Sequence, residues 1–121
     1  MWQRSVGLCL ALYKLTQSFP RQEMYGLTSQ LRRAGVSVAS NIAEGFGRRS
    51  KSDYRSFLRV ARGSVLEIQT QVFIARELQY GEPEKILEAE GLAEEVSRML
   101  WVLIEKLGPV AIAQDKPAIA D

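Results

Sequence analysis

Apolar side chains recur three and four positions apart through four successive segments of this 121-residue chain, a spacing that places them on one face of an α-helix. The third segment is the clearest example, with a single stripe made of Tyr54, Leu58, Ala61, Val65, Ile68 and Val72. No segment shows the alternation typical of a half-buried β-strand. The pattern therefore predicts helices at residues 2–18, 22–45, 51–79 and 83–107.

Proline and glycine separate these segments and predict where the chain reverses. Phe19-Pro20 ends the first helix, because proline disfavours helical geometry in the residue before it. Gly45 and Gly47 are expected to form the turn after the second helix, since glycine readily adopts the left-handed conformation of helix C-caps. Ser50 or Ser52 is then expected to cap the third helix.

Short connections make consecutive helices antiparallel. We therefore expect an all-α fold, an up-down-up-down antiparallel four-helix bundle formed by residues 1–108. Gly108-Pro109 stops the fourth helix, and residues 109–121 are expected to form a mobile C-terminal tail.

Residue composition removes several classes of function. The chain has no histidine, which excludes Ser-His-Asp and Cys-His nucleophiles and metal sites with histidine ligands. We expect no catalytic residues, no metal and no cofactor. Cys9 is the only cysteine, which fits a reducing, cytoplasmic setting. No apolar run approaches the length of about 18 residues that a membrane-spanning helix needs.

Charge is distributed unevenly along the chain. Residues 1–62 contain eleven Lys or Arg and three Asp or Glu, a net charge of +8, whereas residues 63–121 contain five and eleven, a net charge of −6. One interpretation is that the two halves pair with each other, within or between subunits. The other is that the first half presents a basic surface to phosphates or to an acidic partner.

The basic surface, if it exists, is expected on the second and third helices and the turn between them. Arginines four and three positions apart share one flank of a helix, and such clusters can follow a phosphate backbone. The candidate residues for binding nucleic acid are Arg32, Arg33, Arg48, Arg49, Lys51, Arg55, Arg59 and Arg62. The alternatives are a solvated face, or arginines that pair with fourth-helix glutamates across an interface.

Polar and small residues around the second and third helices are interpreted as architecture. Gln30, Ser37, Asn41 and Glu44 are expected to form a structural polar network, with Asn41 in the apolar stripe fixing the register of the helices. Gly63 is costly inside a helix, and close packing of a neighbouring helix against Gly63-Ser64 would offset that cost.

Several large apolar residues lie off the four stripes, and one core does not easily bury them all. Such residues on long helices favour a subunit interface. The candidates for an oligomer interface are Trp2, Cys9, Tyr13, Leu66, Phe73 and Trp101.

Several blocks of residues together resemble the four-helix-bundle family named for the intervening sequences of 23S ribosomal RNA genes. These blocks include Leu27-Thr28-x-Gln30-Leu31-Arg32-Arg33-Ala34, Asn41-Ile42-Ala43-Glu44-Gly45-x-Gly47-Arg48, and Ala61-Arg62-Gly63-Ser64 followed by Glu67-x-x-Thr70-Gln71. The resemblance covers about residues 2–107. It implies a four-helix bundle in a ring-like homopentamer and no settled activity. A related branch comprises accessory proteins of diversity-generating retroelements, which bind nucleic acid and a reverse transcriptase.

Two functional hypotheses follow. The first is a non-enzymatic homo-oligomeric bundle that acts as a nucleic-acid- or ribonucleoprotein-associated scaffold, with RNA or DNA held by the arginine flank. The second is a protein-interaction module whose charged faces serve only self-assembly or docking to a protein partner, such as a reverse transcriptase. A nuclease would need clustered carboxylates, and the basic half has only Glu23, Glu44 and Asp53.

Overall fold

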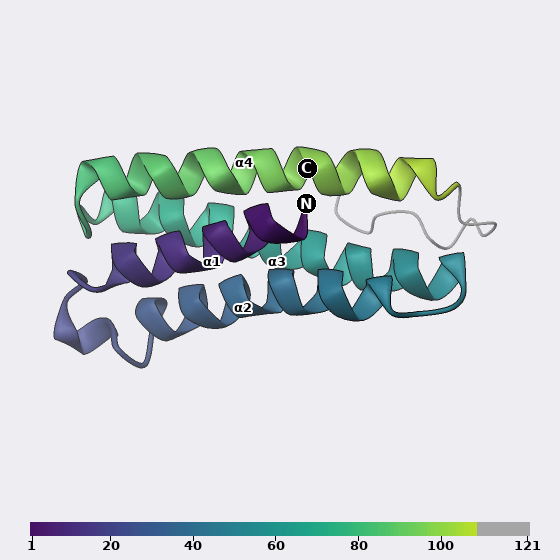
Figure 1. Cartoon of the computed structure of the whole chain (residues 1–121). Helices are drawn as coiled ribbons and strands as arrows, with labels where there is room; N and C mark the ends of the chain where they lie inside the picture. The colour runs from purple at the N-terminus through teal and green to yellow at the C-terminus, as the bar shows by residue number, and fades with distance from the viewer. Residues whose placement is uncertain (109–121) are drawn as a thin grey trace, which may run out of the picture.

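A computed structural model of the chain describes residues 1–108; the tail expected at residues 109–121 lies outside the described residues. Four α-helices run antiparallel to their neighbours and form a bundle (Figure 1). They are α1 (Trp2–Thr16), α2 (Leu27–Phe46), α3 (Lys51–Glu77) and α4 (Pro83–Lys106), with a short 3₁₀ helix, η1 (Arg21–Glu23), between α1 and α2. Each helix packs on the next, and α1 also packs on α4. The predicted four-helix bundle is confirmed.

The core consists of the apolar stripes that the sequence predicts. Leu12 of α1, Leu31 of α2, Ile68 of α3 and Leu100 of α4 are completely buried. Asn41 differs from its expected place, because it lies half-buried at the edge of the stripe rather than within it. Burial of these aliphatic side chains is the main term that holds the four helices together.

The second predicted helix begins too early in the sequence. Residues 22–26 are not α-helical: η1 ends at Glu23, and Gly26 precedes α2 with φ −114° and ψ −113°. The carboxylate of Glu23 accepts a hydrogen bond from the backbone N–H of Leu27 at 3.1 Å, and its other oxygen accepts one from the Tyr80 hydroxyl at 3.2 Å. Glu23 therefore accepts a hydrogen bond from one of the free N–H groups at the start of α2, the role that an N-cap side chain usually has.

The turn between α2 and α3 also differs from the expected geometry. Gly45 is helical and buried, and Gly47 ends α2 with φ −80°, so neither glycine has the left-handed conformation predicted for it. A Cβ atom added at Gly45 would lie 2.7 Å from Cβ of Phe57, which shows that this glycine permits close packing of α2 against α3. Ser50 caps α3 as expected, accepting a hydrogen bond from the Asp53 N–H at 3.0 Å.

None of the helices within residues 1–108 combines the length and the apolar character needed to cross a membrane.

Candidate nucleic-acid interface

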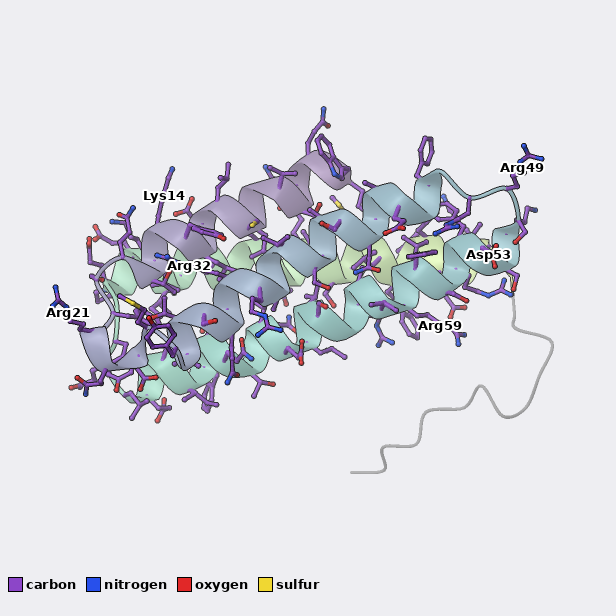
Figure 2. The ribbon with its side chains drawn as sticks, turned by 90° about the horizontal axis from the view of Figure 1, so that it is seen from below. Lys14, Arg21, Arg32, Arg49, Asp53 and Arg59 are labelled. Atoms are coloured by element: carbon purple, nitrogen blue, oxygen red, sulfur yellow. The ribbon has the colours of Figure 1, made fainter. Side chains whose placement is uncertain are left out.

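Basic side chains gather at the end of the bundle where α2 connects to α3. Arg48 forms an ion pair with Glu44 at 3.2 Å, and its guanidinium lies 4.7 Å from the centre of the Phe57 ring. Arg49 and Lys51 are exposed, and neither forms an ion pair or a side-chain hydrogen bond with any of residues 1–108. We call the group of Arg48, Arg49, Lys51 and Arg55 the basic end of the bundle. Figure 2 shows the Arg49 side chain pointing outward from this end.

Arg55 and Arg62 on α3 are committed to contacts with α4. Arg55 donates hydrogen bonds to the carbonyl oxygens of Leu107 at 3.2 Å and Gly108 at 3.4 Å, so its charge lies at the negative C-terminal end of the α4 dipole. The Arg62 guanidinium lies 4.9 Å from the centre of the Trp101 ring, a cation–π contact. Arg59, between them, is exposed on α3 (Figure 2).

Arg32 and Arg33 do not belong to the basic end. Arg32 donates to the hydroxyl of Thr16 at 2.8 Å and to the carbonyl of Tyr13 at 3.4 Å, and its guanidinium lies 4.7 Å from the Tyr13 ring centre. Figure 2 shows Arg32 and Arg49 toward opposite ends of the molecule. Arg33 faces a groove between α2 and α3 instead. The eight candidate residues therefore do not form one patch. Four lie at the basic end, Arg59 and Arg62 lie further along α3, and Arg32 and Arg33 face α1 and the α2–α3 groove.

The four residues predicted as one polar network are also divided. Asn41 donates to the carbonyl of Ser37 at 2.8 Å and to its hydroxyl at 3.1 Å, and that hydroxyl lies 2.9 Å from the hydroxyl of Ser64 on α3. Gln30 accepts a separate hydrogen bond from Gln71 at 3.1 Å. Glu44 lies outside both, since its described partner is Arg48. The hydrogen bonds between Asn41 and Ser37 and between Ser37 and Ser64 join α2 to α3.

The groove between α2 and α3 has a volume of about 370 Å³ and is polar. Its lining consists of Gln30, Arg33, Ala34, Ser37, Ser64, Glu67 and Gln71. The Oε1 atom of Gln71 is buried there without a hydrogen-bond partner in the described part of the chain.

One exposed aromatic residue at the basic end was not among the predicted site residues. Phe46, the last residue of α2, is 78% exposed, and its ring meets Tyr54 edge-on with 6.2 Å between ring centres. From sequence alone, Gly45-Phe46-Gly47 is predicted only to form a turn. A large apolar residue between two glycines at a helix end, directly before basic residues, was the signal that could have found it.

The residues predicted for an oligomer interface are exposed, except for half-buried Cys9, but they occupy different sides of the bundle. Tyr13 lies beside Arg32 on the α1–α2 side, whereas Trp101 lies beside Arg62 on the α3–α4 side. Trp2, Leu66 and Phe73 are each about half exposed. Burial raises the pKa of the Cys9 thiol above its ordinary value and so reduces its thiolate fraction.

The two oppositely charged halves of the sequence are joined by a specific ion pair. Arg4 of α1 binds Glu95 of α4 through two hydrogen bonds, of 2.9 and 2.7 Å, and these lower the pKa of the Glu95 carboxyl. Other acidic residues pair within the second half, as Glu90 does with Arg76 at 2.8 Å. Within residues 1–108, no group of three or more Cys, Asp and Glu side chains is arranged to hold a metal ion.

The fold and this site define a small antiparallel four-helix bundle with a basic end. The family model for the 23S rRNA-intervening sequence protein matches residues 1–102, and the chain belongs to this family. A similar crystal structure is that of a protein of unknown function from the S23 ribosomal protein family of Bacteroides thetaiotaomicron. It is 20% identical in sequence, with a TM-score of 0.77, and the match covers 86% of this chain and 97% of that one. Comparison with curated protein sequences gives no match.

Proposed function

We propose that this protein is a non-enzymatic, homo-oligomeric helical bundle that acts as a scaffold for nucleic acid or a ribonucleoprotein. The observation that carries the proposal is the pair of exposed basic residues, Arg49 and Lys51, that have no partner within residues 1–108 and lie beside Arg48 and Arg55. Cations that no carboxylate neutralises are available to phosphates, whose contacts supply sequence-independent affinity.

The residues proposed to contact phosphates are fewer than those predicted from the sequence. Arg49 and Lys51 are the primary contacts. Arg48 and Arg55 lie at the same end and contribute less, because the Arg48 charge is paired with Glu44 and the Arg55 guanidinium is bound to the carbonyl oxygens at the end of α4. Arg32 is not included, since it binds the C-terminal turn of α1.

The absence of histidine and the lack of a catalytic constellation in the sequence support a binding role rather than catalysis. Self-assembly is proposed from the exposed apolar side chains on several sides of the bundle, including Trp2, Phe73 and Trp101. The family resemblance suggests that the assembly is a homopentamer.

The same apolar side chains favour a second candidate function, a protein-interaction module that binds no nucleic acid. In that case the basic end would contact acidic residues of a neighbouring subunit or of a protein partner. The exposed acidic residues of α4, Glu88 on the side toward α1 and Glu94 on the side toward α3, offer such contacts on a second copy.

One experiment separates the two candidates. The Arg49→Ala/Lys51→Ala variant is compared with Lys14→Ala/Arg21→Ala, a control that removes the same charge from exposed basic residues elsewhere (Figure 2). Binding to structured RNA and duplex DNA is measured at low salt, and mass by light scattering. We expect about tenfold or greater loss of affinity for the first variant only, with unchanged mass. Absence of binding by the wild type would exclude the scaffold function, and a changed mass with unchanged affinity would favour the interaction module.

A further inference from the structure

We propose that the basic end binds unpaired nucleotides, with the ring of Phe46 as the platform on which a base stacks. The inference rests on the proposed function and names its substrate class: single-stranded nucleic acid, or an unpaired stretch within a folded one, rather than a regular duplex. It depends on the placement of one aromatic ring near Arg49 and Lys51, which have no ion-pair partner among the residues that the structure describes.

The ring of Phe46 is exposed and contacts the ring of Tyr54. It is 78% exposed at the end of α2, and its contact with Tyr54 has an interplanar angle of 76°, so Tyr54 meets it without covering both faces. Tyr54 is itself half-buried against the core. Gly45 allows α2 to approach α3 closely at this point, which brings Phe46 to Tyr54. The edge contact with Tyr54 therefore leaves a face of the Phe46 ring open to solvent.

The charges around the ring fit a nucleotide strand. Arg49 and Lys51 follow Phe46 by three and five residues and are exposed. Residues 44–55 carry four basic and two acidic residues; Glu44 is paired with Arg48, and Asp53 lies in the first turn of α3. A phosphate on either side of a base stacked on Phe46 would therefore meet positive potential. Single-strand-binding proteins combine these same two elements, a positively charged surface and an aromatic platform.

The geometry disfavours a duplex as the ligand. Bases in a regular duplex are stacked on each other, so an exposed ring at a helix end reaches only their edges and the backbone. An unpaired base has a free face that can stack on the ring. Base–aromatic stacking contributes roughly a five- to hundredfold difference in affinity for each base.

Tyr25 provides a matched control for Phe46. It is 92% exposed and lies before α2, at the other end of that helix, where Arg21 is the neighbouring exposed cation. Tyr25 thus resembles Phe46 in exposure but is not followed in sequence by a cluster of basic residues such as Arg48, Arg49 and Lys51. Because both side chains lie largely in solvent, neither substitution is expected to alter the melting curve followed by circular dichroism.

The test measures fluorescence anisotropy of a labelled single-stranded RNA of about 16 nucleotides and of the same strand in a duplex. The proteins are full-length wild type, Phe46→Ala, Phe46→Leu, Phe46→Trp and Tyr25→Ala. We expect the wild type to bind the single strand more tightly than the duplex. Phe46→Ala and Phe46→Leu should lose roughly five- to hundredfold affinity for the single strand only, whereas Phe46→Trp and Tyr25→Ala should retain it.

The two proposals fail in different ways. If the wild type binds RNA through Arg49 and Lys51 but Phe46→Ala binds the single strand equally well, the stacking platform is excluded and the scaffold function stands. Equal wild-type affinity for single strand and duplex would also overturn the inference. If the wild type binds neither RNA at low salt, the proposed function itself is wrong and the inference falls with it.

Discussion

Identical residue types in this bundle have different roles because their surroundings differ. Gly45 is buried where α2 and α3 approach, while Gly63 lies in the middle of α3 with no neighbouring helix or side chain within 4 Å of the position a Cβ would take. The expected close packing at Gly63 is therefore wrong, although its neighbour Ser64 is buried and bonded to Ser37. A glycine in a helical pattern signals either case, and the sequence does not distinguish them.

This contrast gives a prediction at two single positions. Gly45→Ala should lower the free energy of unfolding by about 1–3 kcal/mol, because the new methyl group would overlap Cβ of Phe57 and the Tyr54 ring. Gly63→Ala should raise it by roughly 0.5–1 kcal/mol, because alanine costs less backbone entropy in a helix and meets open space. Urea denaturation measures both, and a stabilising Gly45→Ala would contradict the proposed close approach of α2 and α3.

The start of α2 is the helix boundary that the sequence pattern predicts least accurately. The sequence pattern predicts the start of α2 five residues early, because residues 22–26 continue a helical pattern. The observed N-terminus depends on the hydrogen bonds of Glu23 with Leu27 and Tyr80. The Tyr80 contact joins residues 57 positions apart in the chain, which periodicity does not reveal. By contrast, the start of α3 needed only local information, since Ser50 lies three residues before Asp53.

The cap of α3 gives a prediction for a whole element. Ser50→Ala should lower the free energy of unfolding by about 1 kcal/mol, because the Asp53 N–H would lose its acceptor. Ser52→Ala is the matched control: this serine lies inside the first turn of α3, is exposed, and is expected to have little effect. Chemical denaturation of the two variants checks this, and equal effects would show that Ser50 is not the functional cap.

At the scale of the whole molecule, the fold was predictable and the site was only partly so. The four apolar stripes specify the four helices, and short connections specify their antiparallel order, so local patterns were sufficient. The sequence pattern of basic residues was not sufficient to predict the site, because arginines that are close in sequence contact different helices. Arg55 reaches α4, Arg32 reaches α1, and Arg49 remains without a partner among residues 1–108. Those assignments depend on contacts between helices.

The central claim is that Arg49 and Lys51 contact phosphates, and the salt dependence of binding tests it most directly. The logarithm of the association constant for single-stranded RNA is measured against the logarithm of salt concentration for the wild type, Arg49→Ala/Lys51→Ala and Lys14→Ala/Arg21→Ala. Each phosphate contact contributes about 0.7 to the slope for a single strand, so the first variant should have a slope shallower by about 1.4. The control should keep the wild-type slope. Equal slopes for all three proteins would contradict phosphate binding at the basic end.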